Sequence, residues 1–349
     1  NEYLQFSVMT GIMRVAKEGI FSGLNNLDIY TILDEKFADS FGLTENDVNN
    51  ALKEYELTDN IDNVKEWYNG YKFGNYEIYN PWSIIKYLNT KKLDAYWVNT
   101  SDNYLINEVL NISDESIYKA LESLFNGDKI EKFINVNLTF DRVGFQRYLW
   151  LLLLFSGYLT VEGDKNEHGE YSLKIPNKEI YTFFKDAFIE KLTVGEPECF
   201  IGLLKALKKE NIKGVDSFEY NLKKIFLSNI SYHDITNKEN FYHVFMLGIT
   251  VGFENEYKAY SNIESGKGRP DLVLKPINKS KTGYIFEFKI ADSIENFDKK
   301  LDEGIKQIED KNYKTLLSED GVQHILGIAI VFCGKELKIS YKNLSNSLE

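Results

Sequence analysis

Proline and cysteine are scarce in this sequence, which has five prolines and two cysteines among 349 residues. So few prolines exclude a proline-rich linker or scaffold protein. Cys199 and Cys333 cannot form a disulfide framework, and neither has the spacing of a metal site. We therefore expect a reducing, cytoplasmic location.

Long apolar runs are also missing, because no stretch reaches the ~20 apolar residues that a membrane span needs. The most apolar segment, residues 148–159, is too short and predicts a buried helix. The chain starts with Asn1 and has no charged leader before an apolar segment, so we expect no signal peptide and a trimmed chain. No membrane partner is predicted.

A general excess of basic residues is absent too, since the net charge is −12. This excludes a protein that is basic over its whole surface, as many nucleic-acid-binding proteins are. The acidic excess is confined to residues 1–240, because residues 241–349 have 15 basic and 16 acidic side chains. Local basic patches therefore remain available in the last third of the chain.

Apolar residues make up 43% of the sequence and charged residues 27%, which is ordinary for a globular protein. We predict a mostly helical region over residues 11–100. Thr44 precedes a helix with acidic residues in its first turn. Asn69-Gly70 has the sequence of a hairpin turn, and Pro81 is placed to open a helix.

The middle of the chain alternates helices with a hairpin. Residues 142–156 predict an apolar helix, residues 157–177 a hairpin around a polar loop, and residues 178–192 an amphipathic helix. This order is compatible with a winged-helix-like module, although a plain α+β linker domain also fits and is the favoured alternative.

The pattern changes to an α/β domain from Phe241 onward. Residues 324–333 are almost wholly apolar, so this strand should be buried on both faces. The other predicted elements are a helix at 241–253, strands at 257–263, 270–276 and 282–291, a helix at 295–313, and a closing strand at 336–343.

Three charged residues in this domain have the chemistry of a hydrolytic site. Asp271 starts one strand, while Glu287 and Lys289 lie two residues apart on the next. Because strand residues i and i+2 point to the same face, the carboxylate and the ammonium share one side. Two carboxylates form a hard-oxygen site suited to Mg²⁺, and Lys289 can hold an attacking water or balance phosphate charge. The set predicts phosphodiester hydrolysis by metal-activated water.

Spacing alone also fits a cross-strand salt bridge on a solvated face. The preceding turn, "ESGKGRPD" at 264–271, carries Lys267 and Arg269. Such a turn is suited to binding a phosphate backbone, and it also fits an ordinary solvated hairpin.

Five pieces of the last third, in order, resemble the PD-(D/E)xK nuclease superfamily. They are Tyr242-His243, "SNIESGKGRPDLVL", "IFEFKI", "GIKQIEDKNY" and "ILGIAIVF". The resemblance is closest to the nuclease domain attached to AAA-ATPase-like proteins of bacteria. It implies a restriction-endonuclease-like domain with a central mixed sheet, Asp271 and Glu287 as ligands of Mg²⁺ or Mn²⁺, and Lys289 as the catalytic lysine.

The resemblance implies roles for further residues. Gln307 and Tyr313 match a helix motif that faces the active site and the substrate backbone. Glu264 and Arg269 match the hairpin signature, so Glu264 is a candidate metal ligand, and Arg269 either touches phosphate or braces the turn. His243 lies on the leading helix, where it is either a metal ligand or a buried core histidine.

The N-terminal part resembles the C-terminal half of the AAA-ATPase-like domain of the same proteins. The matching segments are "TGIMRVAKEGIFSGLNNLDIYT", "WYNGYKFGNYEIYNPWSIIKYL" and "YWVNTSDN". No phosphate-binding loop of the form G-x-x-x-x-G-K-[ST] occurs here, so we expect no ATP hydrolysis by this chain. The predicted parts are an ATPase-like remnant at 1–100, a helical linker region at 101–240 and the nuclease domain at 241–349.

We therefore predict an α/β protein, α+β overall, that hydrolyses DNA phosphodiester bonds with Mg²⁺. One alternative is a catalytically silent nucleic-acid-binding or regulatory module. The other is an ATP-dependent switch that needs an N-terminal half missing here. Self-association into a homo-oligomer is left open.

Overall fold

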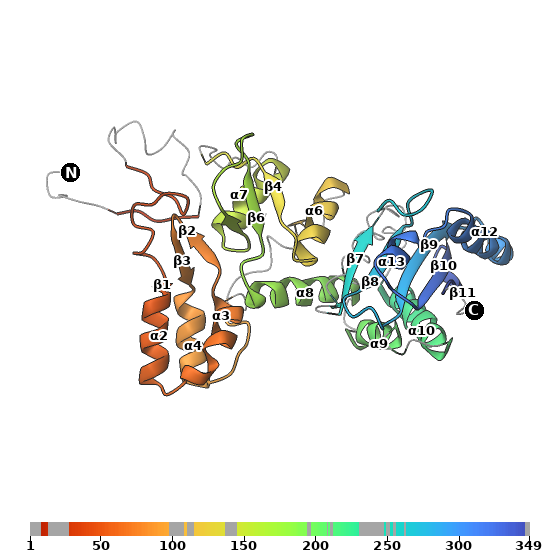
Figure 1. The fold of residues 1–349 in the computed structure, drawn as a ribbon, viewed down its shortest axis with the longest axis horizontal. Helices are drawn as coiled ribbons and strands as arrows, with labels where there is room; N and C mark the ends of the chain where they lie inside the picture. The colour runs from red at the N-terminus through yellow and green to blue at the C-terminus, as the bar shows by residue number, and fades with distance from the viewer. Residues whose placement is uncertain are drawn as a thin grey trace. The chain divides into compact units, whose positions relative to one another are not determined.

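The chain packs as two compact units that alternate along the sequence (Figure 1). Unit 1 comprises residues 1–112 and 127–184, and unit 2 comprises residues 113–126 and 185–349. The predicted domain boundaries near residues 100 and 240 stay predictions. The computed structural model describes residues 8–12, 28–97, 108–109, 115–136, 145–193, 197–207, 209, 212–229, 248, 252–253, 256–261 and 263–345.

The described residues of unit 1 form helices and two small antiparallel sheets, so the described part of residues 11–100 is less uniformly helical than predicted. One sheet has the strand order β1-β3-β2 and the other β4-β6-β5. Its elements are β1 (Leu43–Thr44), α2 (Glu45–Glu54), η1 (Thr58–Asn60), α3 (Ile61–Tyr68), β2 (Tyr71–Phe73), β3 (Tyr76–Tyr79), α4 (Pro81–Thr90), β4 (Ile130–Lys132), α7 (Phe145–Phe155), β5 (Thr160–Glu162), β6 (Tyr171–Lys174) and the start of α8 (Lys178–Thr193).

Two helix starts in unit 1 confirm the sequence prediction. Thr44 forms a capping box with Asp47 at the start of α2, which satisfies backbone N–H groups that have no partner within the helix. Pro81 opens α4, and the Asn80 side chain caps that helix by accepting from the N–H groups of Trp82 and Ser83.

The predicted hairpin turn at Asn69-Gly70 is wrong. Phe73 pairs with Tyr76, so the hairpin of β2 and β3 turns at Gly74-Asn75. Gly70 has a positive φ of 104°, and a Cβ there would lie 2.1 Å from the carbonyl oxygen of Pro176. Glycine is therefore needed at residue 70 for a close approach of two backbone segments rather than for the turn.

The second sheet of unit 1 carries the predicted hairpin of residues 157–177, whose strands β5 and β6 pair antiparallel. α8 follows it and places Glu179 in the core, fully buried. The Glu179 carboxylate accepts hydrogen bonds from the Ser83 hydroxyl at 2.8 and 3.0 Å and from the Trp97 N–H at 2.7 Å. Burial raises the pKa of Glu179, while these donors lower it.

Unit 2 is built on one five-stranded mixed sheet of order β11-β10-β9-β8-β7. β9 and β10 pair in parallel, and the other neighbours pair antiparallel. The strands are β7 (Tyr257–Ser261), β8 (Leu272–Pro276), β9 (Gly283–Ile290), β10 (Ile325–Cys333) and β11 (Glu336–Asn343). The helices are α6 (Glu115–Phe125), the end of α8, α9 (Pro197–Leu207), α10 (Ile212–Asn229), η4 (Ile294–Asn296), α12 (Phe297–Asp310) and α13 (Thr315–Glu319).

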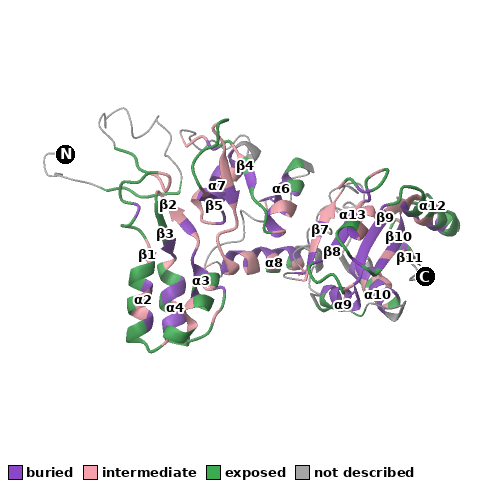
Figure 2. Cartoon of the chain, viewed as in Figure 1, coloured by how far each residue is buried: buried purple, intermediate pink, exposed green. Residues whose placement is uncertain are grey.

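Helices cover both faces of this sheet. α12 packs on one face, where Phe297 and Leu301 meet Ala329 and Val331. On the other face, Phe218 of α10 contacts Phe286 with ring centroids 5.9 Å apart. β10 is buried along nearly its whole length, as its apolar sequence predicts (Figure 2).

α6 covers the outer edge of the sheet, although it lies more than 130 residues before β7 in the sequence. The Asn126 side chain, just after α6, bonds to both the N–H and the C=O of Ala259. Glu122 accepts hydrogen bonds from the N–H and the hydroxyl of Ser261. These side chains satisfy outward-facing backbone groups of an edge strand, which would otherwise be open to pairing.

No helix among the described residues is long and apolar enough to cross a membrane.

Candidate active site

The candidate site lies where β8 begins beside the middle of β9. Leu272 pairs with Phe286, so the same antiparallel register places Asp271 across from Glu287. The Phe288 N–H donates a 2.7 Å hydrogen bond to Asp271 Oδ2, which fixes the carboxylate against β9. The antiparallel pairing of β8 with β9 thus brings together two carboxylates that are 16 positions apart in sequence.

Glu287 is a buried carboxylate with an incomplete set of partners. It is 3% exposed, and Lys289 Nζ lies 2.8 Å from its Oε1. Its Oε2 is buried without a hydrogen-bond partner among the described residues. Burial raises the pKa of Glu287 to about 7, the Asp271 charge adds to this, and Lys289 opposes it. Burial also raises the pKa of Asp271, which the Phe288 N–H and Lys289 lower.

These carboxylates fit a divalent cation. A buried carboxylate with an orphaned oxygen next to a partly buried one is costly unless a cation compensates them, and oxygen donors are what Mg²⁺ prefers. Among the residues that the structure describes, no cluster has three or more His, Cys, Asp or Glu side chains. Asp271 and Glu287 remain the candidate protein ligands in the described part, and His243 lies outside it.

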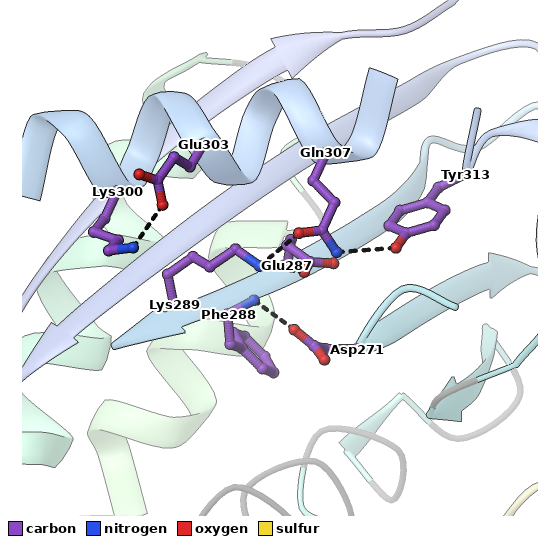
Figure 3. Close-up of polar contacts among 8 residues, drawn as sticks. All are labelled: Asp271, Glu287, Phe288, Lys289, Lys300, Glu303, Gln307 and Tyr313. Carbon is purple, nitrogen blue, oxygen red and sulfur yellow. Dashed lines mark hydrogen bonds and ion pairs between the residues drawn. The ribbon is translucent and has the colours of Figure 1, made fainter. Parts of the chain in front are cut away.

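Lys289 is held in place by a chain of polar contacts (Figure 3). Its Nζ also lies 2.7 Å from Gln307 Oε1 on α12, and Gln307 Nε2 lies 3.1 Å from the Tyr313 hydroxyl. Tyr313 is only 2% exposed. This burial favours a supporting contact to Gln307 over the direct substrate contact that the sequence suggested.

The hairpin before β8 is fixed to the end of α12. The buried Ser265 hydroxyl donates to the Tyr313 carbonyl at 2.5 Å and accepts from the Leu316 N–H. The Lys267 N–H donates to the Lys311 carbonyl at 2.7 Å. Sequence reasoning missed Ser265, because nothing in a polar turn indicates that its hydroxyl is buried against a helix end.

Arg269 and Glu264 form an ion pair of 2.9 Å within this hairpin, and both side chains are exposed. Glu264 therefore does not join Asp271 and Glu287, in contrast to its predicted place as a third metal ligand. The physical reason is that the tight turn directs Glu264 to solvent and to Arg269. Lys267 is likewise exposed.

α12 lies very close to the sheet at Gly304, another residue that sequence reasoning missed. A Cβ at Gly304 would lie 2.9 Å from the Cβ of Ala329. This contact lets Gln307, one turn later, reach Lys289. A glycine inside an otherwise amphipathic helix is the sequence signal for such a close approach.

The comparisons with known proteins agree with this geometry in unit 2. Residues 237–342 match the PD-(D/E)XK nuclease superfamily, and the segment is a domain of that superfamily. The mixed α/β fold with its five-stranded sheet is consistent with a restriction-endonuclease-like domain.

The chain is also similar to a protein of Azotobacter chroococcum mcd 1 named "Uncharacterized protein in vnfD 5'region". The two are 25% identical over 348 residues, which include 93% of this chain and 61% of the relative. The superfamily match does not reach unit 1, so the AAA-ATPase-like resemblance of the N-terminal part stays a prediction.

Proposed function

We propose that this chain hydrolyses phosphodiester bonds of DNA in a reaction that depends on Mg²⁺ or Mn²⁺. The buried Glu287 carries the proposal, because its Oε2 has no hydrogen-bond partner among the described residues and its other oxygen is bound by Lys289. The strand register places Asp271 across from it. A buried carboxylate oxygen without a hydrogen-bond partner is uncommon, and a bound cation would satisfy it. The superfamily domain at residues 237–342 supports a nuclease as the class of enzyme.

Asp271 and Glu287 would hold the cation, which supplies activation of water and neutralisation of phosphate charge. Lys289 carries a positive charge on the same face of β9 and donates hydrogen bonds from Nζ, so it can orient the attacking water or stabilise negative charge on the phosphate. Gln307 accepts from Lys289 and limits where Nζ can lie. Tyr313 in turn positions Gln307. Arg269 and Lys267 are proposed to contact the substrate backbone.

The test is a cleavage assay on single-stranded, duplex and branched DNA with Mg²⁺, Mn²⁺ or a chelator. We expect cleavage only with metal, and loss of cleavage in Asp271→Asn. If wild type cuts no form of DNA with either metal, the nuclease proposal fails. An inert nucleic-acid-binding module, the rival function, then takes its place.

A further inference from the structure

Two surface ion pairs, one exposed and one partly buried, lie at opposite ends of the Lys289–Gln307–Tyr313 chain. At one end, Arg269 and Glu264 pair on the hairpin whose Gly268 packs against the Tyr313 ring. At the other end, Lys300 and Glu303 pair on α12, with Nζ and Oε2 2.6 Å apart. Figure 3 shows Lys300 and Glu303 on the stretch of α12 that precedes Gln307.

Helical geometry places Lys300 close to the site. Residues 300, 303 and 307 share one side of α12, flanking its buried stripe. At a rise of 1.5 Å per residue, Lys300 begins about 10 Å along the helix from Gln307. The hydrogen bond from Lys300 lowers the pKa of Glu303, and the charges of Lys300, Lys299 and Lys289 add to this.

A contribution to the folding stability of the protein does not explain either ion pair. Ion pairs at the protein surface contribute little to folding, because water screens them and their side chains lose freedom. A cation that is held by an exposed carboxylate is available to any stronger anion that reaches it. Arg269 lies two residues before Asp271 in the sequence, and Lys300 lies about two helical turns before Gln307, which contacts Lys289.

We propose that Arg269 and Lys300 are phosphate-binding residues on either side of the site, and that Glu264 and Glu303 occupy them until DNA displaces the carboxylates. The inference rests on the proposed function, because that function supplies DNA as the ligand. It adds Lys300 and Glu303 to the site. It also proposes that the carboxylates of Glu264 and Glu303 compete with DNA phosphates and so weaken DNA binding.

Substituting the cation and substituting the carboxylate of each pair should therefore change the affinity for DNA in opposite directions. Arg269→Gln and Lys300→Gln each remove a phosphate contact, so each should weaken binding and reduce the slope of log K against log salt by about 0.7–0.9. Glu264→Gln and Glu303→Gln free the cations and should tighten binding about 1.5- to 5-fold, the range that an exposed ion pair is worth. If the pairs only stabilise the structure, substituting either member should change the affinity for DNA in the same direction.

The experiment measures binding of the full chain to short fluorescently labelled DNA, single-stranded and duplex, in chelator so that no cleavage occurs. The matched control is the exposed pair Lys65–Glu45 in unit 1, in which Lys65 Nζ lies 3.0 Å from Glu45 Oε1. Lys65→Gln and Glu45→Gln make the same charge changes and should leave binding within the error of wild type. Circular dichroism checks that each variant is folded.

Effects of opposite sign at both site pairs, absent at the control pair, support the inference. Effects of the same sign, no effect, or equal effects at the control pair overturn it, as does absence of DNA binding by wild type. Cleavage is scored separately: cutting by wild type with unchanged binding in all variants leaves the proposed function standing and rejects the inference. The expected binding shifts without any metal-dependent cleavage keep the inference and reject the nuclease.

Discussion

Gly304→Ala tests whether close packing of α12 controls the site. The added Cβ would lie 2.9 Å from Ala329 Cβ and 3.7 Å from Lys289 Cγ. Non-bonded carbons are comfortable from about 3.5 Å, so α12 must move about 0.6 Å away from β10. Overpacking of this kind costs ~1–3 kcal/mol, while alanine gains ~1 kcal/mol over glycine in a helix. The net effect on stability is thus a loss of up to ~2 kcal/mol.

The effect on cleavage should be larger than the effect on folding. Gln307 moves with α12, so its 2.7 Å contact with Lys289 lengthens to about 3.3 Å, outside the usual range of a charge-assisted hydrogen bond. A displacement approaching 1 Å near reacting groups lowers rates up to ~10²-fold. We expect a drop in the cleavage rate with little change in DNA binding in chelator.

A double-mutant cycle with Ala329→Gly isolates this contact. Removing the Ala329 methyl makes room for the new one, so the double variant should recover stability and cleavage, with a coupling of ~0.5–3 kcal/mol. All four tryptophans lie in unit 1, so unit 2 is followed by hydrogen exchange of the β10 amides. If Gly304→Ala is stabilised by its helix propensity and cleaves as fast as wild type, α12 does not press on β10 and the reasoning is refuted.

Three further predictions address the proposed catalytic lysine, a buried carboxylate and the sheet edge. Lys289→Ala should lower cleavage ~10²–10³-fold, since it removes a charge that stabilises the transition state; equal cleavage by this variant and wild type would contradict the assignment. Burial raises the pKa of Glu179 above 4.5, so the stability that its protonated form gives to the fold is complete below pH 4.5 and is lost as pH rises through the raised pKa. Glu179→Gln should therefore gain stability relative to wild type with rising pH, as followed by tryptophan fluorescence, and a pH-independent difference would count against the linkage. Asn126→Ala should speed hydrogen exchange at the Ala259 amide, which loses its side-chain acceptor; unchanged exchange there would mean that another group covers the edge strand.

The sequence by itself determined the elements of the nuclease domain and the face that carries its charges. Predicted strands at 270–276, 282–291 and 324–333 match β8, β9 and β10 closely. Alternation along β9 placed Glu287 and Lys289 on one face, because side-chain direction in a strand follows from local backbone geometry. These are properties of neighbouring residues, and neighbouring residues are what a sequence pattern records.

Only the tertiary structure decided how those charges are held. The burial of Glu287, the close contact at Gly304 and the anchoring of Ser265 depend on how α12 meets the sheet. The pairing of Asn126 with Ala259 joins residues 133 positions apart. Even the turn expected at Asn69-Gly70 was displaced, because strand register and close backbone approach override the preference of a dipeptide. Such contacts depend on the packing of distant segments, whose energies no local pattern contains.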